Sequence, residues 1–217
     1  MDNVSSKEIT DFFQKQKSRA YKKRQLILRA DETPNGVYYI EKGYIKVYTL
    51  TENGDEKIKN FYKPGEIFPL IWTFGNIEKT VFFEAMNDTI LKKIPRQKFL
   101  DFVKTDKKIL LDILSRVISI FIVYSDRIDT LGYTKTYARL ISLLLSLSKR
   151  YGEKYGKNIL LDVPIGHKEI ANSIAMTRET ASRELEKLTK KNIISQKGHL
   201  IIINDIKKLK RELKLAL

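Results

Sequence analysis

The apolar positions of this 217-residue chain predict helix at the start, strands through most of the first half, and helix again afterwards. Residues 6–16 predict a short amphipathic helix with Ile9, Phe12 and Phe13 on its inner side. Between residues 26 and 62 the period falls to two, which is typical of half-buried strands. The alternating pairs are Tyr38/Tyr39, Ile40/Glu41, Ile45/Lys46 and Val47/Tyr48.

Turn signals separate these strands at short intervals. They occupy residues 34–36, 42–43, 53–54, 63–65 and 75–76. The pair Asn53-Gly54 is the combination favoured in two-residue hairpins. Many short strands with regular turns predict a small β-barrel or roll, and residues 95–102 are expected to close it with a short helix.

One long helix is expected over residues 106–132. Its apolar positions are spaced alternately four and three apart, a heptad seam that favours packing against a second copy of itself. The seam consists of Leu110, Leu114, Val117, Phe121, Tyr124, Ile128 and Leu131. Ile109, Ile113 and Ile120 lie off the seam and are expected to pack on the barrel. A helix buried inside its own domain is the alternative, and a hinge is expected over residues 130–134.

Two short helices joined by a very short turn are predicted between residues 167 and 191. Gly166 and Thr177 are the expected N-caps of the first and second helix. In the second helix Ala181, Leu185 and Leu188 recur at i, i+4 and i+7, so they would pack inward. The exposed arc of this helix carries Arg178, Glu179, Ser182, Arg183 and Glu186.

That exposed arc has the chemistry needed in a DNA major groove. Arginine binds the O6 and N7 acceptors of guanine, and a carboxylate accepts from the N4 amino group of cytosine. An ordinary amphipathic helix whose charges are only solvated is the alternative. Two apolar runs around Gly198 predict a β-hairpin directly afterwards. Helix, turn, helix and hairpin in that order predict a winged helix, to which a helix over residues 135–150 is also assigned.

A last amphipathic segment covers residues 205–217. Ile206, Leu209 and Leu213 fall at helical spacing, with lysines elsewhere. Packing against the winged helix is the expected role of this segment. A separate phosphate-binding tail is the alternative.

Two stretches resemble one known family. TRETASRELEKLTKKNIIS followed by KGHLIII resembles the DNA-binding end of the cyclic-AMP receptor protein and fumarate-nitrate regulator (Crp/Fnr) family, and GVYYIEKGYIKVYTLTENGDEKIKNFYKPGEIF resembles its sensor. The resemblance implies an α+β fold with a cyclic-nucleotide-binding-like β-roll sensor domain at 1–105. A dimerisation helix and hinge at 106–132 and a winged helix-turn-helix DNA-binding domain at 133–217 would follow. It also implies a homodimer on a palindromic DNA operator, with RNA polymerase as a further partner.

The resemblance also assigns residues to DNA. Glu179 and Arg183 match the pair that reads the half-site core in this family. Arg178 matches an extra arginine of the cyclic-AMP branch, whereas Ser182 is similar to the fumarate-nitrate branch. A TGTGA-like or TTGAT-like half-site is therefore expected. The DNA-contact candidates are Lys168, Thr177, Arg178, Glu179, Ser182, Arg183 and Lys197.

The sensor departs from the pattern of the cyclic-AMP-binding members. There an arginine and a serine hold the phosphate, and a glutamate holds the ribose. Here Lys79 and Thr80 match the first pair, and residues 69–72 contain no carboxylate. Because lysine lacks the planar fork of arginine, cyclic AMP is disfavoured. The aromatic surroundings fit either a pocket for an apolar effector or a packed barrel core. The effector-pocket candidates are Glu66, Trp72, Lys79, Thr80 and Phe82.

Composition narrows the chemistry further. The chain has no cysteine and two histidines, so disulfides and cysteine-ligated clusters are excluded, and iron-sulfur and haem sensors are disfavoured. We expect no metal site, no catalytic residues and no evident cofactor, and the effector is unknown. The formal net charge is +15, and from Tyr133 onward 18 Lys/Arg face 8 Asp/Glu. This excess suits phosphate neutralisation, although a generally lysine-rich composition is the alternative.

The sequence shows neither a membrane segment nor the motifs of an enzyme. No apolar run of membrane-spanning length and no signal peptide is evident, so a cytoplasmic location without membrane contact is expected. No Gly-rich phosphate loop and no acidic cluster at metal-ligand spacing supports an enzyme. The sequence therefore predicts a homodimeric, sequence-specific transcription regulator. The alternative is a small-ligand or cyclic-nucleotide binding module in which DNA binding is secondary.

Overall fold

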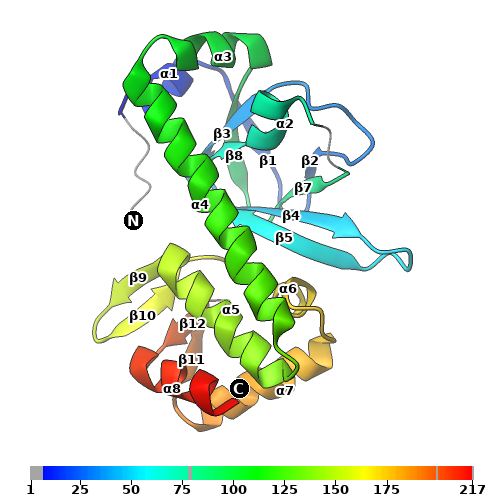
Figure 1. The fold of residues 1–217 in the computed structure, drawn as a ribbon, viewed down its shortest axis with the longest axis vertical. Coiled ribbons are helices and arrows are strands. Elements are labelled where there is room, and N and C mark those ends of the chain that lie inside the picture. Colours follow the sequence, from blue (N-terminus) through cyan, green and yellow to red (C-terminus); the bar gives the residue numbers. More distant parts are fainter. Residues whose placement is uncertain (1–6, 78–79, 199, 217) are drawn as a thin grey trace. The chain divides into compact units, whose positions relative to one another are not determined.

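The computed structural model describes residues 7–77, 80–198 and 200–216, whose fold is drawn in Figure 1. The described chain packs into two compact units. One contains the residues up to Thr49 together with Lys59–Ile122, and the other contains Leu50–Ile58 and the residues from Val123 onward. The long helix α4, Lys107–Gly132, contributes residues to both units.

The first unit is built around antiparallel strand pairs. Its elements are α1 (Lys7–Gln14), β1 (Ser18–Tyr21), β2 (Leu26–Leu28), β3 (Val37–Lys42), β4 (Ile45–Leu50), β5 (Glu56–Tyr62), β6 (Ile67–Phe68), α2 (Leu70–Gly75), β7 (Phe82–Ala85), β8 (Thr89–Ile94) and α3 (Arg96–Lys104). The last residue of β4 and the first three residues of β5 belong to the other unit. In the described part of the chain these strands form two sheets, ordered β1-β8-β3-β6 and β2-β7-β4-β5. The predicted roll and its closing helix are thus confirmed.

The strands of the roll are more deeply buried than their alternation predicted. Tyr38 and Tyr39 point to opposite faces of β3, yet both are buried. Tyr39 packs with Phe13 and Phe99 of α1 and α3, which cover the face that was expected to meet solvent. On β4 the buried Lys46 is neutralised by Glu84, 3.3 Å away on β7. The expectation of half-buried strands is therefore wrong at Tyr39 and Lys46, because helices and an ion pair replace water there. It is confirmed at Ile40 and Glu41, which are buried and exposed in turn.

The hairpin between β4 and β5 also differs from the prediction. The strands end at Leu50 and begin again at Glu56, so the connection is longer than two residues. The N–H of Thr51 donates to the carbonyl of Asp55, and the Thr51 hydroxyl accepts from the N–H of Asp55. This extra closure places the turn inside residues 51–55. Gly54 has φ +80, a conformation that favours glycine.

Helix α4 binds the first unit through its off-seam residues. Ile109 and Ile113 are buried in the same cluster as α1 and α3, and Ile120 packs against it, as predicted. The contacts of Arg116 were not predicted from the sequence. Its guanidinium donates to the carbonyl of Gly65 at 2.9 Å and pairs with Asp112 at 3.3 Å. This buried arginine therefore ties the helix to the turn that precedes β6.

The second unit contains the predicted winged helix. Its elements are α5 (Thr136–Tyr151), β9 (Gly152–Tyr155), β10 (Asn158–Leu161), α6 (His167–Ser173), α7 (Arg178–Lys190), β11 (Ile194–Lys197), β12 (Leu200–Ile203) and α8 (Ile206–Ala216). The predicted hairpin is β11-β12, although His199 in its turn lies outside the described residues. The hairpin β9-β10 was not predicted. It extends the wing into a sheet ordered β11-β12-β10-β9.

Helix α8 packs within this unit, as its apolar spacing predicted. Leu209 is fully buried. The Glu212 carboxylate accepts from the Tyr137 hydroxyl of α5 at 2.8 Å and from the ammonium group of Lys191 at the end of α7. The bond from Lys191 lowers the pKa of Glu212. The link is therefore retained at neutral pH and is lost only as the pH falls through that lowered pKa.

Candidate nucleic-acid interface

Helices α6 and α7 begin at caps that the sequence indicated. The carboxylate of Glu169 accepts from the backbone N–H of Gly166 at 2.9 Å, which fixes the start of α6. The hydroxyl of Thr177 accepts from the N–H of Thr180 at 3.1 Å, which fixes the start of α7. Each cap satisfies a donor that the helix itself leaves unpaired.

The turn between the two helices is short and partly left-handed. Ala175 has φ +51, and the N–H of Met176 donates back to the carbonyl of Ala171 at 3.2 Å. The guanidinium of Arg139 on α5 donates to the carbonyls of Ile174 and Ala175 at 3.2 and 3.3 Å. A cation at the C-terminal end of α6 is favoured by the helix dipole. Sequence analysis did not find this role of Arg139.

The two faces of α7 separate as predicted. Ala181, Leu185 and Leu188 are buried, whereas Arg178, Glu179, Arg183 and Glu186 are exposed. Glu184 departs from the expected pattern because it is buried. Its carboxylate accepts from Lys187 at 2.8 Å and from the Thr136 hydroxyl at 3.3 Å, which anchors α7 to α5.

Most of the predicted DNA contacts lie on exposed surface. Arg178, Glu179, Ser182 and Arg183 share one arc of α7, and Thr177 lies at its start. Lys168 is exposed on α6 and Lys197 on β11. The ammonium group of Lys197 is 3.2 Å from the hydroxyl of Tyr155 on β9, whose ring centroid lies 4.9 Å away. This aromatic support for the wing was not found from the sequence.

Ser182 differs from its neighbours because its hydroxyl is already engaged. Its Oγ lies 2.7 Å from Nδ1 of His167, the first residue of α6. The other ring nitrogen, Nε2, lies 3.2 Å from the side-chain nitrogen of Gln196 on β11. One imidazole therefore connects both helices of the motif with the wing. Sequence spacing gave no indication of this connection.

The predicted effector residues lie in different surroundings. The Glu66 carboxylate accepts from the N–H of Lys63 at 2.9 Å, and Trp72 on α2 is buried with the α1 and α3 side chains. Phe82 on β7 stacks on Tyr48 of β4, its neighbouring strand in the same sheet, with a centroid distance of 5.3 Å. Thr80 is exposed, and Lys79 lies outside the described residues.

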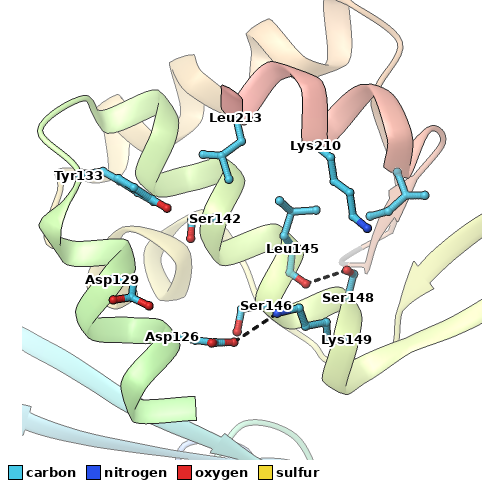
Figure 2. A pocket seen from close by; sticks show the side chains of 11 residues that line it. Asp126, Asp129, Tyr133, Ser142, Leu145, Ser146, Ser148, Lys149, Lys210 and Leu213 are labelled. Atoms are coloured by element: carbon cyan, nitrogen blue, oxygen red, sulfur yellow. Dashed lines mark hydrogen bonds and ion pairs between the residues drawn. The ribbon is translucent and has the colours of Figure 1, made fainter. Parts of the chain in front are cut away.

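A cavity of about 490 Å³ lies elsewhere, in the second unit. Figure 2 shows the end of α4 on one side of it, with α5 and α8 completing the wall. Asp126 and Lys149 form an ion pair across 3.7 Å at its edge. The lining residues are Asp126, Asp129, Tyr133, Ser142, Leu145, Ser146, Ser148, Lys149, Ile206, Lys210 and Leu213. The cavity is thus lined by both polar and apolar side chains and contains none of the predicted effector residues.

Comparisons with known proteins match two separate parts of the chain, one containing the β-roll and the other the winged helix. The cyclic nucleotide-binding domain family matches residues 18–106, and the Crp-like helix-turn-helix domain family matches residues 138–212. The anaerobic regulatory protein of Haemophilus influenzae is 27% identical over 88% of this chain and 74% of its own length. The cAMP-activated global transcriptional regulator CRP of Salmonella typhimurium is 24% identical over 84% of this chain and 87% of its own. A CooA mutant from Carboxydothermus hydrogenoformans has a similar fold, with TM-score 0.81 at 20% identity over 98% of this chain and 97% of that one.

A cyclic-nucleotide-binding β-roll, a long helix and a winged helix-turn-helix together define a DNA-binding regulator with a sensor domain. This chain belongs to the Crp/Fnr family of transcription regulators, which are not enzymes. Because the sequence has no cysteine, an iron-sulfur cluster would lack its thiolate ligands. Among the described residues, no three His, Asp or Glu side chains gather as a metal site would require. Nor is any described helix long and apolar enough to cross a membrane.

The left-handed turn residue gives a stability prediction. Ala175→Gly should raise the free energy of unfolding by roughly 0.5–1 kcal/mol, because glycine relieves the left-handed strain but adds entropy to the unfolded chain. Ala175 is exposed, so no packing is lost. Asn192→Gly is the control: Asn192 also has positive φ, +55, but asparagine tolerates it better and the gain should be smaller. Urea unfolding would measure both, and a loss of stability in Ala175→Gly would contradict the turn geometry.

Proposed function

We propose that the protein is a homodimeric, sequence-specific transcription regulator that places two copies of α7 on a palindromic DNA operator. The main support is the arrangement of α7. Its apolar stripe is buried, and its N-terminus is capped by Thr177. The arc that begins with Arg178 and includes Arg183 therefore faces solvent. In this docking mode the N-terminal turns of the second helix reach the base edges.

The side chains on α7 have distinct expected partners. Arg183 and Arg178 suit the O6 and N7 acceptors of guanine, and Glu179 suits the N4 amino group of cytosine. Likeness to the family supports a TGTGA-like or TTGAT-like half-site. Lys168 and Lys197, exposed on α6 and the wing, are suited to phosphates on either side. The basic excess of the DNA-binding half supports the same assignment.

The exposed face of α4 supports the homodimer. Six of the seven seam residues, all except the half-buried Tyr124, have exposed fractions between 40% and 72%. Leu111, Ile118 and Ile122 beside the seam are also exposed. These exposures do not fit the alternative of a helix buried in its own domain. An apolar stripe along a 26-residue helix is typical of a surface that another chain covers.

The sensor domain is proposed to respond to a small molecule other than cyclic AMP. The absent carboxylate in residues 69–72 and the hydrogen bond that engages Glu66 support this exclusion. RNA polymerase in the cytoplasm is the proposed partner once the dimer is on DNA. The sensor would then act by changing the placement of the two α7 helices.

Base reading can be tested by two contrasting substitutions. Arg183→Ala should cost about 1–3 kcal/mol per half-site and relax the preference at one base pair, because it removes a bidentate guanine contact. Lys197→Ala should weaken binding to all sequences alike. It should also reduce the slope of the logarithm of the binding constant against the logarithm of the salt concentration by about one unit, because one phosphate contact is lost. Fluorescence anisotropy on operator variants across a salt series measures both. An equal loss on every variant would make Arg183 a phosphate anchor and refute its proposed role.

The dimer can be tested on the seam. Val117→Asp combined with Phe121→Asp should separate the subunits, because unpaired carboxylates buried in an interface cost ~3–5 kcal/mol. Ser115→Asp adds a charge to the same helix off the seam and serves as the control. Sedimentation at micromolar concentration gives the oligomeric state. A monomeric wild-type protein would contradict the seam and the two-fold operator together.

Calorimetry tests the exclusion of cyclic AMP. No binding heat is expected at physiological nucleotide concentration, because no carboxylate is placed for the ribose and lysine replaces the bidentate arginine. The same titration with operator DNA present separates a regulator from a ligand-binding module. Micromolar affinity that tightens operator binding would overturn the exclusion.

A further inference from the structure

The contacts of His167 determine which ring nitrogen carries the proton. The amide nitrogen of Gln196 can only donate, so Nε2 of His167, 3.2 Å away, must accept. In the neutral imidazole the proton then lies on Nδ1. This N–H donates to Oγ of Ser182 at 2.7 Å. Because Ser182 accepts from His167, its own hydroxyl proton remains available for another acceptor.

Ser182 occupies the same arc of α7 as Arg178 and Arg183, on the face proposed to meet the bases. A hydroxyl that donates suits thymine O4 or the guanine O6 and N7 acceptors. A hydroxyl that only accepts would suit the amino groups of adenine and cytosine instead. The proton on His167 therefore decides whether Ser182 can donate to a base edge, because a lone pair of the hydroxyl oxygen can accept in either case.

We propose that His167 is a positioning residue that makes Ser182 a hydrogen-bond donor toward DNA, and that Gln196 of the wing fixes the tautomer of His167. This assignment rests on the proposed operator reading by α7. Reversal would require Gln196 to turn its carbonyl oxygen to Nε2, which would move the proton away from Nδ1. Specificity at one base pair thus depends on the wing as well as on the helix.

The first test needs no DNA. Long-range ¹⁵N NMR of the free full-length protein at mildly alkaline pH reports which nitrogen of each neutral ring is protonated. The chain has two histidines, so His199→Gln assigns the signals. We expect His167 to be mainly protonated on Nδ1, and Gln196→Leu to abolish that bias. Protonation mainly on Nε2 in the wild-type protein would overturn the proposal.

The second test is a double-mutant cycle on operator variants. Ser182→Ala should lower operator affinity about three- to tenfold and flatten discrimination at one position, since one hydrogen bond is lost. His167→Ala should reproduce that loss at the same position. The double variant should be no worse than Ser182→Ala alone, because His167 acts through Ser182. His167→Asn, whose amide can still donate, should recover part of the discrimination.

Lys168→Ala is the matched control, because Lys168 adjoins His167 and is proposed to contact phosphate. Its effect should be equal on all sequences and should add to that of Ser182→Ala. If the His167→Ala loss persists fully in the Ser182→Ala background, His167 contacts DNA directly and the positioning role is refuted. If wild-type protein does not prefer any operator over random DNA, the proposed function fails, whereas the ring-nitrogen result still decides the tautomer.

Discussion

The buried stripe of α7 is the constraint on which the proposed interface depends. Ala181, Leu185 and Leu188 exclude water on one side of the helix, and the helix geometry then turns the polar arc outward. Burying each leucine side chain stabilises the fold by about 1.5–3 kcal/mol. The polar anchors, Thr177 at the cap and Glu184 against α5, fix the helix along its axis and about it. A base-contacting surface needs the buried stripe and the polar anchors together, because a helix that could rotate would not present the same side chains to DNA.

Helix α4 differs from α7 because its exposed face is apolar. Its off-seam isoleucines pack against the first unit, which contains the sensor β-roll, and the guanidinium of Arg116 donates to the carbonyl of Gly65 in that unit. The seam keeps its apolar side chains exposed. Breaking the buried arginine contacts would leave an unpaired charge, which is costly, so the helix is firmly held by the sensor. A rigid helix fixed on one side is well suited to carry a change in the sensor toward a partner covering the other side.

Periodicity predicted the parts of the fold that depend on local spacing. The heptad positions of α4, the stripe of α7 and the caps Gly166 and Thr177 all follow from residues within a few turns of one another. It failed where burial depends on distant elements. Tyr39 and Lys46 are buried because α1, α3 and Glu84 come from elsewhere in the chain. The hairpin β9-β10 was missed because the exposed side chains of β9 carry no apolar alternation.

The same limit applies to the site. Spacing predicted that Arg178, Glu179 and Arg183 share one surface, because a helix fixes the directions of their side chains. It also predicted Ser182 as a DNA contact, but without any partner for its hydroxyl. The partners of Ser182 are found only in three dimensions: His167 is 15 residues away, and Gln196 lies 29 residues beyond His167. A serine hydroxyl has no fixed hydrogen-bonding sense of its own. In the proposed interface the hydrogen-bonding role of Ser182 therefore depends on its network, and substitutions in the wing are expected to change base preference without altering α7.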